Sequence, residues 1–517
     1  MKLFDELANI VKRRGDTALH VVAFVGAFVA LVAPFALVTY PQMVDLPMHA
    51  AQTSALRHLS DPSYAFDQQF ELHPLGYPYM SSYALGAVLM SFMSAIAATK
   101  IANVVLLAFV PAGLATLAWG MRRSPLIALA AVPFAFSGMA LWGTVSSLSA
   151  IGMMAMALGL TLRALERPSP RLFVATGAVL ALTFFTQVFR APIAIASVAI
   201  AWAFSDKRRE TVRPLLLACL PTVALLVAFL ALRPAGLRPD IGPITLRTDR
   251  LSLVFDTVVS ELMSKPERAA ARRHVAVVVA IGFATFGIAW ARRATQPASS
   301  FERRAHWTLV CTIALCCLGY LFLPDRLGIY FGAAAREATS VTYLAIALIP
   351  NLPRELSLRA AAVAAMLWSA LSITDLAILR FVPFDTRLEA FTSISEQIPK
   401  APKLCYLVYD EEYAMTLVPA YVQAEKGGFL SYHFASIGAS PFAYRTDEAA
   451  VVPPPAPGAE RFQWRPELFD LAEQGPFFDW FLVVSNVDRS LIFVADPTIR
   501  LVDHRGDFWL YTRTTKP

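Results

Sequence analysis

The apolar run Leu19–Val38, LHVVAFVGAFVALVAPFALV, decides the fold of this chain, and the stretch TYPQMVDLPMH, residues 39–49, follows it directly. An α-helix needs about 20 apolar residues to cross the hydrocarbon core of a bilayer, which is the length of this run. The run contains Pro34 and lacks a small-x-small cleavage pattern before Tyr40, so it is not typical of a signal peptide. We therefore expect a retained membrane-spanning helix.

Similar apolar runs recur along the chain from about residue 19 to about residue 378. Hydrophobic residues make up 56% of the 517 residues, and the mean hydropathy is +0.53, which is more apolar surface than a soluble domain can bury. The sequence therefore predicts a polytopic α-helical membrane protein with about 11 to 13 transmembrane helices in residues 19–380.

Positive charges indicate which end of each helix faces the cytoplasm. Residues 1–18 form an amphipathic N-terminus that ends with Lys12, Arg13 and Arg14, and the positive-inside rule makes this segment cytoplasmic. Later arginine-rich loops alternate with arginine-poor loops, which we expect outside. The main external loops are then residues 40–76, 137–147, 233–272 and 324–338.

One pair of charges conflicts with this topology. Two full spans, at 77–98 and 100–120, would place Arg122 and Arg123 outside. Either one of the two segments fails to cross the membrane, or the positive-inside rule is broken at this point.

Residues 385–517 differ in composition from the rest of the chain, with charges, prolines and alternating apolar residues. They predict a small α/β domain, which the charge pattern places outside the membrane. Residues 404–409 and 480–484 are rich in β-forming residues, 499–503 and 508–512 predict a hairpin, and 411–424 could form a helix.

Asp45 and His49 are polar residues immediately outside the first apolar run. If residues 46–59 form a helix, Asp45, His49 and Gln52 share one face, as in an amphipathic helix lying on the membrane. Asp45 could then serve only as the helix N-cap, and His49 could have no function. Alternatively, a partly desolvated Asp45 has a raised pKa and acts as a general base, while His49 positions it or a phosphate.

Three arginines, Arg190, Arg326 and Arg336, lie at the expected external boundary of the membrane. A charge in hydrocarbon is costly, and the guanidinium group can bind phosphate through two parallel hydrogen bonds. Anionic headgroup contact is thus one interpretation of these residues. The alternatives are that their side chains reach into the water or, for Arg336, that it pairs with Glu337.

Several classes of function receive no support from the sequence. The five cysteines show no CxxC or Cys/His metal spacing, and there is no Walker loop, HExxH, GxSxG or dinucleotide fingerprint. No basic stripe with interleaved aromatic residues indicates nucleic-acid binding, and the spans lack the interrupted, charged pairs of an inverted-repeat transporter.

The layout resembles the GT-C superfamily of membrane glycosyltransferases, which use polyprenyl-phosphate-linked sugars. The resemblance rests on an acid in the first external loop, here Asp45 within Asp-Leu-Pro-Met-His, and on His73-Pro74 before the next span. A Pro, Gly and Arg pattern from Pro324 to Arg336 and an external C-terminal α/β domain complete it. Uncharacterised bacterial members of the superfamily share the Asp-x-Pro-x-His pattern.

The resemblance implies a bacterial inner-membrane protein that transfers a hexosyl or pentosyl group from a polyprenyl-phosphate donor to an acceptor at the periplasmic face. Asp45 would be the catalytic base or would help to hold a divalent cation, with His49 in support. The residues expected to contact substrate or phosphate are Arg336, Arg190, Arg326, His73 and Gln52.

The chain departs from the superfamily in one respect. Many members carry a second acid in the next external loop, and residues 137–149 contain none, which argues against a metal site built from paired acids. The alternative functions are a non-catalytic protein that binds lipid-linked glycans or assists envelope assembly, and a transporter or flippase.

Overall fold

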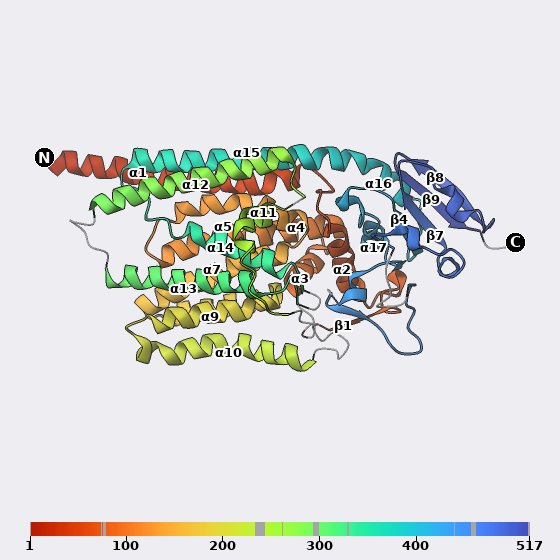
Figure 1. The fold of residues 1–517 in the computed structure, drawn as a ribbon, viewed down its shortest axis with the longest axis horizontal. Helices are drawn as coiled ribbons and strands as arrows, with labels where there is room; N and C mark the ends of the chain where they lie inside the picture. Colours follow the sequence, from red (N-terminus) through yellow and green to blue (C-terminus); the bar gives the residue numbers. More distant parts are fainter. Residues whose placement is uncertain are drawn as a thin grey trace.

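The first apolar run forms part of α1 (Lys2–Ala36), a long helix at one edge of an elongated helical bundle in the computed structural model (Figure 1). The N-terminus lies at one end of the bundle, and a smaller mixed unit that contains the C-terminal residues lies at the other end. The structure describes residues 2–73, 75, 79–232, 243–260, 262–292, 299–327, 330–438, 440–455 and 462–514.

The bundle consists of apolar helices that lie roughly along its long axis (Figure 1). After α1, its elements are α3 (Met80–Leu89), α4 (Ala95–Leu107), α5 (Phe109–Gly120), η2 (Pro125–Phe136), α6 (Gly138–Leu141), α7 (Val145–Glu166), α8 (Pro170–Thr186), η3 (Val188–Arg190), α9 (Ala191–Ala203), α10 (Arg208–Leu232), α11 (Arg250–Val259), α12 (Lys265–Arg292), α13 (Ser300–Phe322), the two-residue strands β2 (Arg326–Leu327) and β3 (Tyr330–Phe331), α14 (Ala333–Ile346) and α15 (Leu356–Arg387).

The described part of the chain contains seven helices that are long and apolar enough to cross a membrane, and four shorter apolar helices. The prediction of a polytopic helical membrane protein with a small C-terminal α/β region is therefore confirmed. The seven long helices fall short of the predicted 11 to 13 spans, because several passages along the bundle, such as η2, α8 and α9, are short.

The conflict at Arg122 and Arg123 is resolved by the first two segments after the external loop. Residues 95–120 form one 26-residue span, whereas α3 has ten residues and is about 15 Å long, half of what a crossing needs. Among the described residues, one long apolar span thus lies between α2 and Arg122, and Arg122 pairs with Glu166 at the C-terminal end of α7. Of the two explanations that the sequence left open, the short α3 favours the one in which the segment at 77–98 does not cross in full.

Helices α5 and α7 meet at the centre of the bundle through glycines. A Cβ atom at Gly113 would collide with the Gly152 backbone, and one at Gly120 would collide with the Gly159 backbone. Small residues allow helix backbones to approach closely, which replaces the hydrophobic driving force that lipid does not supply. α7 is the most buried of the long spans, with 83% of its apolar window buried, and it begins near Asp45.

The C-terminal unit is built on a five-stranded sheet in the order β5-β4-β7-β9-β8. β4 runs parallel to β5 and β7, while β9 runs antiparallel to β7 and β8. Its strands and helices are α16 (Glu389–Ser395), β4 (Lys403–Val408), η5 (Tyr413–Met415), α17 (Ala420–Lys426), β5 (Phe429–Leu430), η6 (Phe434–Ile437), β6 (Phe442–Tyr444), η7 (Pro466–Leu468), η8 (Gly475–Phe477), β7 (Trp480–Val484), η9 (Ser490–Phe493), β8 (Ile499–Arg505) and β9 (Phe508–Arg513).

The two predicted strands and the predicted hairpin are present in this sheet as β4, β7 and β8–β9. The helix expected at 411–424 is wrong over most of its length, because residues 413–415 form only a 3-10 turn and Pro419 precedes the seven-residue helix α17. Residues 456–461, between β6 and η7, lie outside the described residues.

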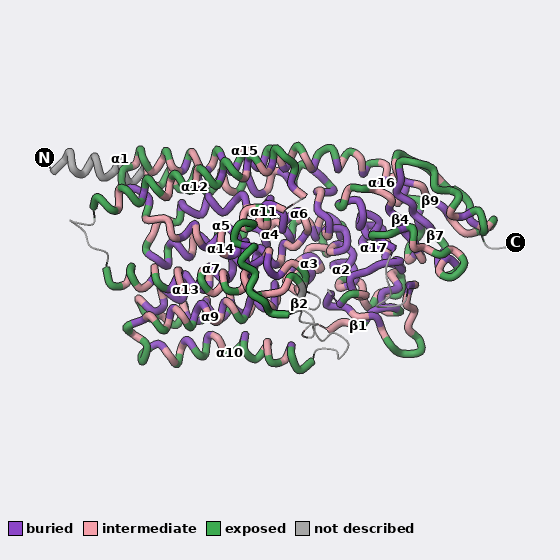
Figure 2. Tube along the Cα trace, in the orientation of Figure 1, coloured by how far each residue is buried: buried purple, intermediate pink, exposed green. Residues whose placement is uncertain are grey.

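The first external loop joins the bundle to the C-terminal unit. It contains α2 (Leu46–His58), η1 (Pro62–Tyr64) and β1 (Phe70–Leu72), and β1 pairs antiparallel with β6. The predicted helix at 46–59 is confirmed, but its placement on the membrane surface is wrong. α2 is largely buried (Figure 2) because it packs against α3 and α4 on one side and α17 on the other.

Replacing Gly152 by valine should destabilise the bundle, because the new side chain would collide with the backbone of α5 at Phe109 and Val110. Overpacking at such a contact costs about 1–3 kcal/mol of unfolding free energy. Thermal unfolding of the purified protein in detergent measures the effect. Gly287→Val is the matched control, since nothing lies within 4 Å of a Cβ at that helical glycine, and an equal loss in both variants would contradict the packing argument.

Candidate functional site

Asp45 occupies the N-cap position of α2, but its side chain makes no capping hydrogen bond. Two backbone hydrogen bonds hold it beside the next external loop: Val44 N–H donates to the Leu141 carbonyl at 2.9 Å, and Asp45 N–H donates to the Trp142 carbonyl at 3.2 Å. The carboxylate is therefore not used to complete the helix, which was the structural role that the sequence allowed for it.

The environment of Asp45 changes its acidity. Burial raises the pKa of Asp45 to about 7, and the positive charge of Arg336 opposes this rise. Desolvation disfavours the charged form of a carboxylic acid, whereas a nearby cation favours it. A carboxylate whose pKa is raised toward neutrality suits a group that accepts a proton from a hydroxyl.

Both ring nitrogens of His49 are engaged. Nε2 lies 3.2 Å from the Gly143 carbonyl oxygen, and Nδ1 lies 2.8 Å from the Tyr83 hydroxyl. Burial lowers the pKa of His49 to about 4, so the ring is neutral. Because a carbonyl can only accept, Nε2 carries the proton and Nδ1 accepts from Tyr83. His49 thus ties α2 to the loop that contacts Asp45 and to α3.

Gly143 lies directly against Asp45. Its φ angle is +91°, and a Cβ atom at this position would lie 2.6 Å from the Cβ of Asp45. Glycine adopts such a positive φ without the steric penalty of other residues. The close approach of the loop to Asp45 therefore depends on the absence of a side chain at residue 143.

Arg336 belongs to the first turn of α14 and is largely buried. Its Nε donates to the Phe331 carbonyl at 3.2 Å, and its Nη1 donates to the Ser147 hydroxyl. The amide of the fully buried Gln187 donates to the same hydroxyl at 2.7 Å. Ser147, in the first turn of α7, thus joins the start of α14 to the end of α8.

Arg190 is 1% exposed and forms a two-pronged ion pair with Glu337, with N–O distances of 2.8 and 2.9 Å. The pair neutralises the charge of Arg190, so the predicted phosphate contact would have to compete with a buried carboxylate. Glu337 pairs with Arg190 and follows Arg336 directly, so this ion pair fixes the turn of α14 that carries Arg336.

The other predicted site residues are spread over the external loop. His73 Nε2 lies 2.9 Å from Glu71, and the His73 backbone N–H donates to Pro441, at the junction with the C-terminal unit. Gln52 is fully buried on α2, and both polar atoms of its amide lack a hydrogen-bond partner among the described residues. The side chain of Arg326, Pro74 and residues 233–242 of the large loop lie outside the described residues.

The sequence predicted that Asp45 and Arg336 lie on the same side of the membrane. It did not predict the residues that position them. Tyr83, Gly143 and Ser147 carried no motif, and the loop 137–149 attracted notice only for its lack of an acid. The glycine between Trp142 and Thr144 was the one signal that the backbone here needs an unusual conformation.

The donor groups near Asp45 do not fit a divalent cation. Within the described ranges, no three His, Cys, Asp or Glu side chains are grouped so that they could hold a metal ion. The charged neighbour that lowers the pKa of Asp45 is itself a cation, Arg336. A hard cation requires several oxygen ligands, so we derive no step through a metal.

Comparison with known proteins gives similarity at the level of the fold. No protein-family model and no curated protein sequence matches the chain. Among solved structures, ArnT from Cupriavidus metallidurans bound to undecaprenyl phosphate matches with a TM-score of 0.53 and 12% identity, covering 96% of this chain and 97% of ArnT.

A second structure, the arabinofuranosyltransferase AftD from Mycobacteria, matches with a TM-score of 0.50 and 15% identity. The match covers 96% of this chain but only 40% of AftD. The resemblance inferred from the sequence thus extends to the arrangement of the helices and the C-terminal unit.

Changing Gly143 to alanine should lower the melting temperature more than changing Gly332 to alanine. Both glycines have positive φ, but nothing lies within 4 Å of a Cβ at Gly332, whereas a Cβ at Gly143 would press on Asp45. A positive φ costs a residue with a Cβ atom about 1–2 kcal/mol in both variants, so the difference between them measures the contact with Asp45. Equal decreases in the melting temperature of the two variants would show that this contact does not contribute to stability.

Proposed function

We propose that this multi-pass membrane protein, which has the fold of the GT-C glycosyltransferases, transfers a sugar from a polyprenyl-phosphate donor to an acceptor hydroxyl. The observation that carries the proposal is Asp45, a carboxylate that makes no capping bond, has a pKa near 7 and lies within the electrostatic reach of Arg336. The fold neighbour ArnT was solved with undecaprenyl phosphate, which supports a lipid of this class as the carrier.

In the proposed reaction, Asp45 accepts the proton of the acceptor hydroxyl. The acceptor oxygen forms a bond to the anomeric carbon of the sugar, and the bond from that carbon to the phosphate oxygen breaks. The electron pair of the broken bond remains on the polyprenyl phosphate. Arg336 neutralises this developing charge, a form of stabilisation that often contributes most to the rate.

The other predicted residues have positioning roles in this proposal. His49 is neutral and fully hydrogen-bonded, so it holds the loop with Gly143 against Asp45 and does not itself move a proton. Ser147 orients the Arg336 guanidinium group, and Arg190 fixes the helical turn through Glu337. Preorganised groups stabilise charge without rearranging during the reaction.

The Asp45 carboxylate also favours a transferase over a protein that only binds lipid-linked glycans. A protein that only binds lipid-linked glycans has no need for a carboxylate with a pKa near 7 beside a cation, whereas a transferase needs a base at this position. We propose that the site faces the periplasm of a bacterial inner membrane. The end of the bundle next to α2, whose N-cap is Asp45, is opposite to the N-terminus and carries the C-terminal unit (Figure 1).

Replacing Asp45 by asparagine should abolish sugar transfer, because the amide cannot accept the proton; loss of a general base lowers rates by about 10²- to 10⁴-fold. A strain that lacks the gene is complemented with wild type, Asp45→Asn or Asp67→Asn, the last an acid of the same loop on another segment. Mass spectrometry of lipid-linked and surface glycans should show restoration by wild type and Asp67→Asn only. Identical profiles in all strains would rule out the proposed transferase.

The protonation of Asp45 should depend on the charge of Arg336. Infrared difference spectra of wild type against Asp45→Asn isolate the carboxylic acid band, which should disappear with a midpoint near pH 7 as the pH rises. In Arg336→Gln the midpoint should move to higher pH, because the cation that favours the ionised form is gone, and in Arg336→Lys it should stay close to 7. A midpoint near 4 in wild type, or a downward shift in Arg336→Gln, would contradict this electrostatic argument.

A further inference from the structure

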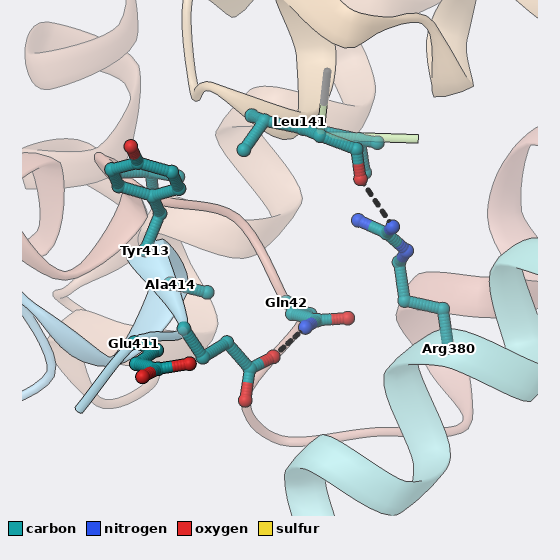
Figure 3. Close-up of a pocket in the computed structure, with 9 residues that line it drawn as sticks. Gln42, Leu141, Arg380, Glu411, Tyr413 and Ala414 are labelled. Carbon is teal, nitrogen blue, oxygen red and sulfur yellow. Dashed lines mark hydrogen bonds between the residues drawn. The ribbon is translucent and has the colours of Figure 1, made fainter. Parts of the chain in front are cut away.

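A cavity of about 280 Å³ lies between the bundle and the C-terminal unit (Figure 3). Val44 and Leu141, which precede Asp45 and Trp142, are two of its lining residues. The rest of the lining comes from Gln42, from Leu262 before α12, from α15 and from the segment around η5. Its polar members are Gln42, Arg380, Glu411, Glu412 and Tyr413.

The polar groups of this cavity are held in fixed positions. Gln42 Nε2 donates to one carboxylate oxygen of Glu412, and Arg387 donates to the other at 3.0 Å. Arg380 is anchored by Glu267, with two N–O distances of 2.9 Å, and by the Leu262 carbonyl. A preformed cavity with a few fixed polar groups is typical of small-molecule sites.

The ionisable side chains around the cavity carry a net negative charge. Arg387 contacts three carboxylates, those of Asp410, Glu412 and Asp507, and the exposed Glu411 adds a fourth negative charge nearby. Glu267 already neutralises Arg380, the one cation among the lining residues of this described cavity. Like charges repel more strongly where water is partly excluded, so an anionic ligand is disfavoured.

Aromatic rings form the outer edge of the cavity. The Tyr413 ring lies 5.7 Å from the Trp142 ring and 6.1 Å from the Trp464 ring, measured between centroids. Tyr413 is 51% exposed and Trp464 is 46% exposed, so apolar ring surface remains open to a ligand. Figure 3 shows Tyr413 and Gln42 on two sides of the same space, with Arg380 opposite.

From these observations we infer that the cavity binds an uncharged sugar ring, the acceptor end of the substrate. The inference rests on the proposed transferase function. Carboxylates and amides match sugar hydroxyl groups, and an aromatic ring matches the apolar C–H face of the sugar. The volume is at the lower end of the roughly 300–1,000 Å³ range of ligand sites, which suits one ring more than a chain of several. Val44, which directly precedes the residue proposed to take the acceptor proton, lines the cavity.

Saturation-transfer NMR on the full-length protein in nanodiscs tests this inference. The probes are a panel of neutral methyl hexosides and pentosides, with glucuronic acid as the anionic probe. Wild type should transfer saturation to at least one neutral glycoside and not to glucuronic acid. Tyr413→Ala should weaken neutral binding about five- to tenfold, as expected for the loss of one aromatic contact.

Two control variants make the outcome specific. Trp307→Ala removes an exposed aromatic residue from the bundle helix α13 and should leave binding within about twofold of wild type. Asp45→Asn should also retain binding, so a failure of the transferase proposal is distinguishable from a failure of the cavity. Saturation of glucuronic acid equal to that of the neutral sugars, no signal from any neutral glycoside, or unchanged binding in Tyr413→Ala would overturn the inference.

Discussion

The site depends on one contact, the short backbone pairing between the segment before α2 and the loop that follows η2. The backbone N–H groups of Val44 and Asp45 donate to the carbonyls of Leu141 and Trp142. The next residue, Gly143, lies directly against Asp45, which is possible because glycine has no side chain. This pairing keeps an acid at the start of a helix without using it as a cap. It also places Val44 and Leu141 in the cavity wall, so the proposed base and the proposed acceptor site share one support.

The bundle holds that contact in place through its most closely packed helices. α7 begins immediately after the loop and is locked to α5 through paired glycines, and its first turn carries Ser147, which accepts from Arg336. The buried ion pair between Arg190 in η3 and Glu337 in α14 also holds α14 in place. Breaking a buried ion pair is costly, so it restrains the arginine beside it even though it takes no part in the proposed reaction.

The local features of the chain could be predicted from its sequence because they depend on neighbouring residues. The first span, the helix at 46–58 and the strands β4 and β7 follow from hydropathy and β-propensity. The burial of α2 could not be predicted, since α17, which covers it, is distant in sequence, and the composition of α2 alone suits a membrane surface. The sequence could not show which of the segments 77–98 and 100–120 fails to cross, because the apolar residues of α3 run on into the next helix and resemble a full span.

In the candidate site, too, some features could be predicted from the sequence and others depend on long-range packing. Charge patterning placed Asp45 and Arg336 on one side of the membrane, and the electrostatic influence of Arg336 on Asp45 is consistent with that. The partner of Glu337 could not be read from the sequence, where the adjacent Arg336 was the obvious candidate and Arg190 is the one observed. Long-range pairing of this kind depends on how the helices pack, which a periodic pattern does not encode.

The central claim is that Asp45 takes the acceptor proton during transfer from a polyprenyl-phosphate sugar. The most direct measurement is the release of free polyprenyl phosphate when purified protein in nanodiscs is incubated with a lipid and glycan extract of its own membranes. The account predicts release by wild type and none above background by Asp45→Asn. Equal release by both proteins would contradict it.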